Sequence, residues 1–350
     1  MGLPNVVVEF RNKATTAVTR SERGVVCVVL TDATKTTTLH EYKVASDVPA
    51  SDWTAENAGL LKDALEAGAS KLYAVRIGAS EDIDDVKATL DALKFNWICH
   101  LNTTQTDIVS YVVARNASGS SLRVKAIVSG ATSPDDMHVV NLKNTKVTKK
   151  DGTELTANKY LPHLAGVLAG MGMDRSVTYY ELSDLQAVDD VSQPGDAVDG
   201  GYLVLINDYG TVKISRGVNS ATTAENDDFK KIAIVEAMDM IREDIMETFK
   251  NYYLGKYKNS LDNQSLFVAA VNTYFRTLTG EGVLNPDYDN LAEIDTTAQR
   301  SAIVASGKTE ALDWDDQTVK KNPFKSNVYL KANVQILDAI EDLTFSIYMN

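Results

Sequence analysis

The sequence contains few of the residues from which catalytic and metal sites are built. Only two cysteines and four histidines occur among 350 residues. Cys27 and Cys99 both lie inside apolar runs, which favours two buried, reduced thiols; a disulfide or a metal site is the alternative interpretation. The histidines, at positions 40, 100, 138 and 163, include no pair with the i,i+4 spacing of helix-borne ligands. We therefore expect no catalytic residues, no metal and no cofactor.

Positive charge is also scarce. Lys and Arg number 35 against 48 for Asp and Glu, a net charge of −13, and the basic residues form no stripe. This balance argues against nucleic acid and anionic membranes as partners, although solubility and self-repulsion would explain the same value. No signal-peptide pattern opens the sequence and no apolar run reaches membrane-spanning length. We expect synthesis in a cytoplasm.

The first half of the chain alternates strands with helices. The apolar run at residues 24–30 is typical of a strand covered on both sheet faces, and residues 57–67 have the spacing of an amphipathic helix. The elements expected next are a strand at 71–77, a helix at 81–94 capped by Ser80, a strand at 95–101, a helix at 104–117, a strand at 122–129 and a helix at 161–171. This order predicts an α/β domain over residues 21–199, a layered and mostly parallel sheet with a β-rich excursion near 122–156.

A β-hairpin is predicted at the start of the second half. Tyr202–Ile206 is apolar, Asn207–Gly210 forms a turn, and Thr211–Arg216 alternates apolar and polar residues. An isolated hairpin is only marginally stable, so we expect further strands to join it. The residues predicted to accept those strands are Val204, Ile206, Val212, Ile214 and Arg216.

The rest of residues 200–342 is predicted to complete an α+β domain. A long helix begins at Asp227 and Asp228, with an apolar stripe through Ile234 and Ile241 and with Asp239 on its solvated face. A second helix is expected at 262–278. Residues 281–327 are acidic and weakly patterned, and residues 328–336 alternate as a strand does.

Both ends of the chain have strand patterns without an obvious local partner. Residues 1–20 are either an edge strand on the chain's own sheet or an arm that reaches a neighbouring copy, and residues 343–350 read as a strand. Because a strand added to an open sheet edge gains a row of backbone hydrogen bonds, we interpret both ends as inter-subunit links. The linking residues are Val6, Val7, Val8, Glu9 and Phe10 in the arm, and Leu343, Thr344, Phe345, Ser346, Ile347, Tyr348 and Met349 in the strand.

One motif suggests an enzyme instead. Residues 302–309 end in Gly307-Lys308-Thr309 and match a relaxed phosphate-loop pattern. Such a loop must follow a buried strand and open a helix, but residues 292–300 are too polar for a central strand. A nucleotide-binding α/β enzyme using this loop is the alternative hypothesis.

Several stretches resemble the tail sheath proteins of contractile phage tails and phage-tail-like (R-type) bacteriocins. The similarity lies in the order of five stretches: residues 164–170, 176–179, 212–220, 228–232 and 252–259. The final Asp338-Ala339-Ile340-Glu341 fits as well. The similarity is greatest to the short sheath proteins of Gram-positive prophage tails, and a non-phage injection machine is an alternative within the class.

The resemblance implies a structural subunit, not an enzyme. In that family, six-fold rings stack around an inner tube, terminal arms add strands to neighbouring subunits, and contraction drives the tube through a cell envelope. The implied partners are other copies of the chain, the tail tube protein, and baseplate and tail terminator proteins, with no nucleic acid and no membrane. The implied location is a phage tail or phage-tail-like particle assembled in the host bacterial cytoplasm. The family's α/β domain has been compared with subtilisin, but this sequence contains no triad, so no protease activity follows.

Overall fold

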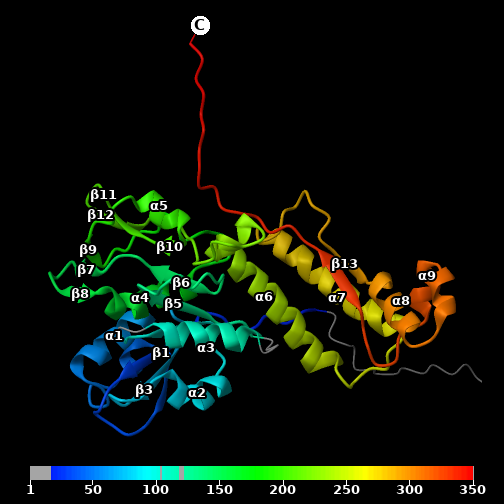
Figure 1. Cartoon of the computed structure of the whole chain (residues 1–350), viewed down its shortest axis with the longest axis horizontal. Coiled ribbons are helices and arrows are strands. Elements are labelled where there is room, and N and C mark those ends of the chain that lie inside the picture. Colours follow the sequence, from blue (N-terminus) through cyan, green and yellow to red (C-terminus); the bar gives the residue numbers. More distant parts are fainter. Residues whose placement is uncertain (1–16, 103–104, 118–121, 350) are drawn as a thin grey trace, which may run out of the picture. The chain divides into compact units, whose positions relative to one another are not determined.

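The computed structural model describes residues 17–102, 105–117 and 122–349 (Figure 1). Backbone contacts divide the chain into two units. The large unit comprises residues 21–243 and 337–350, and the small unit comprises residues 1–20 and 244–336. The division at 243/244 differs from the predicted one near residue 200, and the predicted hairpin lies within the large unit.

A seven-stranded sheet organises the large unit, in the order β10-β6-β5-β4-β1-β3-β2. Every pairing is parallel except that of β2 with β3. The strands are β1 (Val25–Thr31), β2 (Leu39–Tyr42), β3 (Lys71–Ile77), β4 (Trp97–His100), β5 (Lys125–Ser129), β6 (Val139–Leu142) and β10 (Tyr202–Leu203). The predicted mostly parallel α/β sheet is thus confirmed; β2 was not anticipated.

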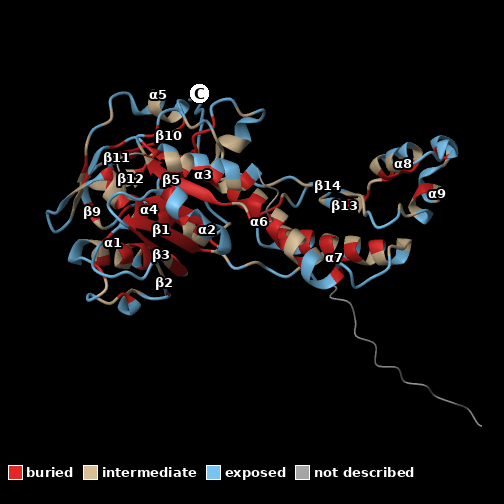
Figure 2. Cartoon of the chain, turned by 60° about the horizontal axis from the view of Figure 1, so that its bottom comes forward, coloured by how far each residue is buried: buried red, intermediate tan, exposed pale blue. Residues whose placement is uncertain are grey.

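Helices cover both faces of this sheet, as its apolar strands require. Val26, Val28 and Leu30 of β1 lie in the core that includes α1 (Ala55–Glu66) and α4 (Ala157–Gly170). Their neighbours Val25, Cys27 and Val29 face α2 (Ile83–Ala92) and α3 (Thr106–Ala117). Figure 2 shows this burial along the strands and the inner helix faces. Both cysteines are buried and free, as the apolar runs predicted.

The cap of α2 differs from the prediction. Asp82, not Ser80, is the N-cap, and its carboxylate accepts a hydrogen bond from Asp84 N at 2.8 Å. In return Asp85 accepts from Asp82 N at 2.9 Å, which completes a capping box. The helix therefore begins at Ile83, two residues later than its predicted start.

Two smaller sheets complete the large unit. β7 (Lys146–Lys149) pairs with β8 (Glu154–Thr156) and with β9 (Leu185–Val188), and all pairings are antiparallel. The predicted hairpin is β11 (Leu205–Asp208) and β12 (Thr211–Ile214). Its turn residues Tyr209 and Gly210 have φ values of 45° and 86°, the left-handed backbone of tight hairpin turns. A short helix, α5 (Pro194–Asp199), precedes β10.

The second half is more structured than its pattern suggests. α6 (Ile232–Thr248) begins in the large unit and continues into a π-helical turn at Phe249–Tyr253, followed by α7 (Leu261–Gly280). The weakly patterned stretch 281–327 contains β13 (Leu291–Ile294), α8 (Thr296–Ala305) and α9 (Asp316–Lys321). β13 pairs antiparallel with β14 (Leu330–Asn333), the core of the strand predicted at 328–336.

Candidate subunit-linking surfaces

The phosphate-loop motif does not have the geometry of a nucleotide site. Ala302 to Ala305 are the last turn of α8, and Gly307 follows the helix C-terminus with a φ of 99°. Lys308 and Thr309 then lead into a single 3-10 turn. A phosphate needs the N–H groups of a helix N-terminus after a buried strand, whereas this loop follows the carbonyl end of a helix. The nucleotide-binding alternative is therefore wrong.

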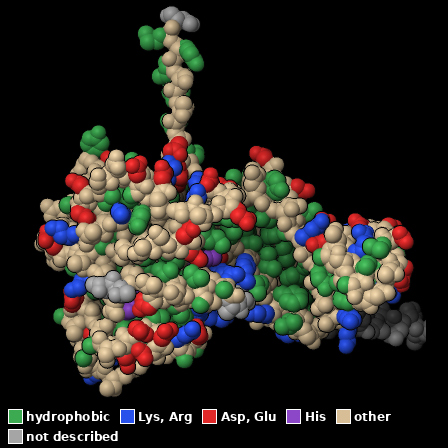
Figure 3. Space-filling view, viewed as in Figure 1, with side chains coloured by type: hydrophobic (Ala, Val, Ile, Leu, Met, Phe, Trp, Pro, Cys, Tyr) green, Lys and Arg blue, Asp and Glu red, His purple; other side chains and the backbone are tan. Residues whose placement is uncertain are grey.

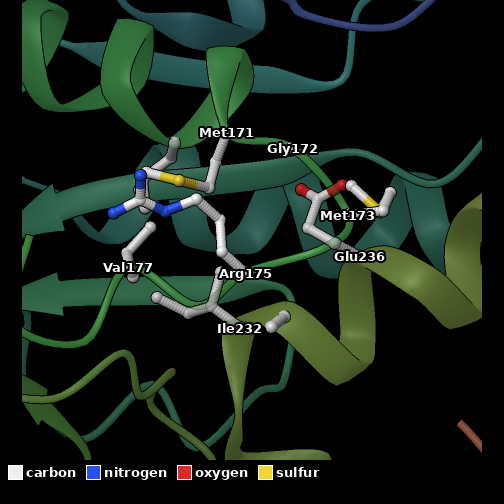
Figure 4. Close-up of a pocket in the computed structure, with 9 residues that line it drawn as sticks. Met171, Gly172, Met173, Arg175, Val177, Ile232 and Glu236 are labelled. Atoms are coloured by element: carbon white, nitrogen blue, oxygen red, sulfur yellow. The ribbon is translucent and has the colours of Figure 1, made fainter. Parts of the chain in front are cut away.

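Among the described residues, no three His, Cys, Asp or Glu side chains gather as a metal site, and no helix is long and apolar enough to cross a membrane. A hollow in the large unit, of about 310 Å³ of empty space, lies between the end of α4 and the start of α6 (Figure 4). Its acid, Glu236, pairs with Arg23 and lies 3.2 Å from Lys125 Nζ. Apart from Arg175, the other lining residues are apolar or glycine: Leu168, Met171, Gly172, Met173, Val177, Ile232 and Ala233.

A buried charge cluster fixes the first turns of α6 in the large unit. Lys125 Nζ of β5 lies 2.9 Å from Asp239 Oδ2, and His138 Nε2 lies 3.3 Å from Asp239 Oδ1. Burial opposes ionisation of Asp239, but Lys125 and His138 outweigh it and hold its pKa below the usual range. Asp239 was predicted to be solvated, so that prediction is wrong. Each charged side chain in this cluster has an ion-pair partner, which indicates that the cluster holds α6 in place.

The predicted C-terminal linking strand is extended and uncovered. The exposed fractions are 86% for Leu343, 75% for Phe345, 75% for Ile347 and 95% for Met349. Figure 3 shows these hydrophobic side chains standing along the segment. No strand of the described chain pairs with residues 343–349. Large apolar side chains left this exposed mark an interaction site.

The root of this segment, residues 338–342, is held firmly by the large unit. Thr178 Oγ1 and Ser176 Oγ donate to Glu341 Oε1 at 2.5 and 3.1 Å. Asp338 pairs with Lys231, and Asp342 Oδ1 lies 2.6 Å from Arg216 Nη2. Arg216, predicted to accept a strand, instead holds the chain just before the exposed segment begins.

The N-terminal linking residues Val6–Phe10 lie outside the described residues, so their role stays a prediction. The described end of that arm is anchored in the small unit. Thr19 N donates to Thr248 Oγ1 at 3.0 Å. Arg20 pairs with Glu281 and lies 3.8 Å from Asp244 Oδ2.

The hairpin is not short of neighbours, contrary to expectation. Along β12, Tyr179 N donates to Ile214 O, Ile214 N to Tyr180 O and Leu182 N to Val212 O, at 2.8 to 3.0 Å. Along β11, the Asn144 side chain bonds both Leu205 N and Leu205 O. Val204, Val212 and Ile214 are at most 1% exposed. The edge of β12 and the Leu205 end of the β11 edge are therefore occupied within the large unit, and Ile206 is half-buried.

An open strand edge lies instead in the small unit, at β14. The Asn272 side chain bonds Ala292 N at 2.7 Å and Ala292 O at 3.0 Å, on the side of β13 away from β14. Ala292 is therefore in a non-hydrogen-bonded pair with Ala332, and the N–H and C=O of Ala332 point away from β13. No hydrogen bond from the described residues reaches those groups, and Ala332 is exposed. Sequence reasoning missed this edge because β13 has no clear strand pattern.

The geometry defines a class of protein. An uncovered apolar terminal segment, rooted by ion pairs, and an unpaired sheet edge are the parts of a self-assembling structural subunit.

Comparisons with known proteins give the family. Residues 224–350 match the model of the phage tail sheath C-terminal domain family. Over 99% of its length the chain is 28% identical to the tail sheath protein of Clostridium phage phiCD119, of which 99% is covered. The resemblance found in the sequence is thus confirmed. The protein is a structural component of a contractile tail or tail-like particle, and not an enzyme.

Solved structures share the fold. The sheath tail protein of Desulfitobacterium hafniense is 16% identical, with a TM-score of 0.73 over 96% of this chain and 98% of that one. The helical sheath of the anti-feeding prophage in its contracted state is 14% identical, with a TM-score of 0.72 over 100% of both chains. The contracted PVC sheath, from an extracellular contractile injection system, is 11% identical, with a TM-score of 0.74 over 100% of this chain and 98% of that one.

Proposed function

We propose that this chain is the repeating subunit of a contractile sheath, which polymerises in stacked rings around an inner tube and shortens to drive the tube through a cell envelope. The observation that carries the proposal is the exposed C-terminal segment. Its alternating apolar residues have no cover among the described residues, while the same chain offers an unpaired edge at β14.

In this proposal, residues 343–349 of one copy pair with β14 of another. We prefer β14 to the hairpin, which we expected to accept the strand, because residues 179–182 already bond along β12. Four to five added backbone hydrogen bonds at about 1 kcal/mol each contribute several kcal/mol, and burial of the apolar side chains adds to this. The N-terminal arm, through Val6–Phe10, supplies a second link. Several links per subunit keep the polymer connected because all must break for one copy to leave.

The roots of the links explain how such a polymer can rearrange without coming apart. Asp338–Asp342 are tied to the large unit by charged pairs, and Arg20 is tied to the small unit. The connections can therefore stay joined while the bodies repack. New contacts between bodies supply the work, with no nucleotide hydrolysed. The further partners are the tube, baseplate and terminator proteins, with assembly in the host cytoplasm and with neither nucleic acid nor membrane bound.

Deletion of residues 343–350 tests the proposal. We expect the full chain to form long hollow cylinders in negative-stain electron microscopy. The truncated chain should stay folded, with an unchanged circular dichroism spectrum, but remain unassembled. Cylinders from the truncated chain would rule out the C-terminal link, and discrete particles from the full chain at every concentration would contradict the polymer itself.

A further inference from the structure

The small unit contains a pocket lined by aromatic side chains at the N-terminal end of α7. Four rings line it: Phe249, Tyr253, Tyr257 and Phe267. Phe267 lies edge-on to Phe249 and Tyr253, with ring centroids 5.3 and 4.7 Å apart, so these walls are packed against one another. The empty volume is about 510 Å³, part of which is open to solvent. The pocket can therefore receive a large side chain from outside the subunit.

A buried acceptor in this pocket lacks a donor. Gln264, near the start of α7, also lines the pocket and is only 3% exposed. Its Nε2 donates to Asn259 Oδ1 at 2.7 Å, whereas its Oε1 has no hydrogen-bond partner among the described residues. Because an unpaired buried carbonyl oxygen is unfavourable, the occupant of the pocket should bring an O–H or N–H group.

The rim of the pocket is basic, in a chain whose net charge is −13. Residues 249–260 contain three lysines and no acid, and residues 317–336 contain four lysines and no acid. Asn259 Nδ2 donates to Lys325 O at 3.1 Å, so the two stretches lie side by side where they line the pocket. Lys258 is one of the lining residues, and neither Lys258 nor Lys325 has an acidic partner among the described residues.

The other end of α7 carries an exposed tyrosine between two acids, in the loop that joins α7 to β13 (Figure 1). Asp287, Tyr288 and Asp289 are all exposed, Tyr288 to 43%, and neither aspartate has a cationic partner in the described part of the chain. Tyr288 N donates to Asn285 O at 3.3 Å, and Asn290 Nδ2 donates to Tyr288 O at 3.1 Å, so hydrogen bonds fix the backbone of this turn. The loop presents an aromatic ring and a phenol O–H flanked by negative charge.

The acidic loop and the basic pocket lie too far apart to meet within one subunit. Val283 N bonds Leu278 O and Ala292 N bonds Asn272 Oδ1, which places the loop between them toward the C-terminal end of α7. Leu278 is about 20 Å from Gln264 along the helix axis, at about 1.5 Å per residue. Lysines before a helix N-terminus and acids after its C-terminus also oppose the helix dipole, so the stability of the subunit does not account for them. Complementary surfaces at opposite ends of one unit indicate a head-to-tail contact between copies.

We propose that Tyr288 of one copy inserts into the aromatic pocket of the next copy, where its hydroxyl donates to Gln264 Oε1. The two flanking aspartates then face Lys258 and Lys325 at the rim. This inference rests on the proposed function, and it adds a contact between small units that does not involve the terminal segments. Tyrosine suits the pocket because it combines a large apolar ring with a polar tip. Because the two surfaces differ, each copy uses one of them toward each neighbour, and the contact repeats along the polymer.

Photo-crosslinking between full-length chains tests this contact. An isotope-labelled chain with p-benzoylphenylalanine in place of Tyr288 is mixed with unlabelled chain, assembled into cylinders and irradiated. We expect mass spectrometry to identify a peptide pair that joins labelled residue 288 to unlabelled residues 249–267. The matched control carries the photoreactive residue in place of Tyr209, which is fully exposed in the large unit, and should not mark that peptide.

Substitutions with natural residues test the ring and its hydroxyl separately. Tyr288→Ala should raise the protein concentration needed for assembly by about tenfold or more, as loss of a buried interface tyrosine does. Tyr288→Phe keeps the ring but leaves Gln264 Oε1 unpaired, so we expect a smaller rise, of about three- to tenfold.

Charge exchange tests the rim. Lys258→Glu and Asp289→Lys should each raise the concentration needed for assembly by about five- to tenfold, because an attraction becomes a repulsion. A chain with both substitutions should assemble more readily than either single variant, since the pair is restored in the opposite sense. Lys308→Glu, at an exposed lysine of the same unit that does not line the pocket, is the control and should assemble normally.

The outcomes separate this contact from the proposed function. Cylinders without a cross-link to residues 249–267, or unchanged assembly of Tyr288→Ala, would overturn the insertion of Tyr288 while the polymer stands. A double charge variant that assembles no better than the single variants would overturn the pairing at the rim. If the unsubstituted chain forms no cylinders, the proposed function fails and this inference with it.

Discussion

Asp342 Oδ1 lies 2.6 Å from Arg216 Nη2, one residue before the exposed C-terminal segment begins. Asp338 pairs with Lys231, and Glu341 accepts hydrogen bonds from Ser176 and Thr178. Together with the Asp342–Arg216 ion pair, these contacts fix the point at which the C-terminal segment leaves its own large unit. Ion pairs thus hold both Asp338 and Asp342, whereas residues 343–350 include no charged side chain.

Loss of Lys231 should loosen this root. Lys231→Ala removes the partner of Asp338 and a cation 3.9 Å from Glu341 Oε2. We expect faster amide hydrogen exchange at residues 337–342, measured by mass spectrometry on the unassembled chain. Lys230→Ala is the control, because Lys230 pairs with exposed Asp227 three residues earlier. Equal protection in both variants would mean that the ion pairs do not hold the root.

The open edge of β14 can be blocked without unfolding the subunit. Ala332→Pro removes an N–H that points away from β13, so the ladder within the small unit stays complete. We expect a folded chain that forms no cylinders, seen by negative-stain microscopy, whereas Ala332→Ser should assemble normally. Normal assembly of the proline variant would exclude this edge as the acceptor.

The contact between α1 and α4 depends on a glycine. A Cβ added at Gly166 would lie 2.2 Å from Ala64 O, closer than any real contact, so Gly166→Ala must push the helices apart. We expect a loss of about 1–3 kcal/mol in the free energy of unfolding, measured by urea titration. Gly59→Ala in α1 meets nothing within 4 Å and should be neutral or stabilising, by up to about 1 kcal/mol. Equal stability of the two variants would contradict the close approach.

His138 should make stability depend on pH. Burial alone would lower its pKa, but hydrogen bonds to Asp136 and Asp239 outweigh burial and the nearby Lys125, and the pKa is raised. The stabilisation is therefore complete below about pH 6.5, the ordinary histidine value, and is lost as the pH rises through the raised pKa. His138→Gln should cost more unfolding free energy at pH 6 than at pH 8.5.

His40 is the matched control for that experiment. Burial and the neighbouring Arg76 lower its pKa, so the folded protein prefers the neutral ring. Any stabilisation from His40 is present above about pH 6.5 and is lost as the pH falls below that value. This trend is the opposite of the one expected for His138. If His40→Gln and His138→Gln change with pH in the same direction, the assignment of His138 is wrong.

The parallel sheet was predictable because its signal is local. The apolar run 24–30 reads as a doubly covered strand, and the structure places its alternate residues in two cores. α1, α3 and α7 followed from their spacing within a few residues. The alternating apolar pattern of the exposed C-terminal segment could also be read from the sequence, since strict alternation is a property of the sequence alone.

The sequence by itself determined the α/β class, the strand-like character of the C-terminal end and, through the order of its motifs, the family. Tertiary structure alone decided which sheet edge is open. The hairpin 205–214 looked incomplete, yet residues 179–182 bond along β12 and Asn144 bonds Leu205 of β11. The strand β14 showed no sign of an open edge in the sequence, yet the Asn272 side chain bonds β13 on the side away from β14, and the backbone groups of Ala332 point away from β13. Likewise, the sequence pattern placed Asp239 in solvent. The fold instead brings it within hydrogen-bond distance of Lys125, which lies 114 positions earlier in the sequence. Pattern reports the preferences of a segment, whereas the pairing of a backbone edge or a buried charge depends on residues that only folding brings within hydrogen-bond distance.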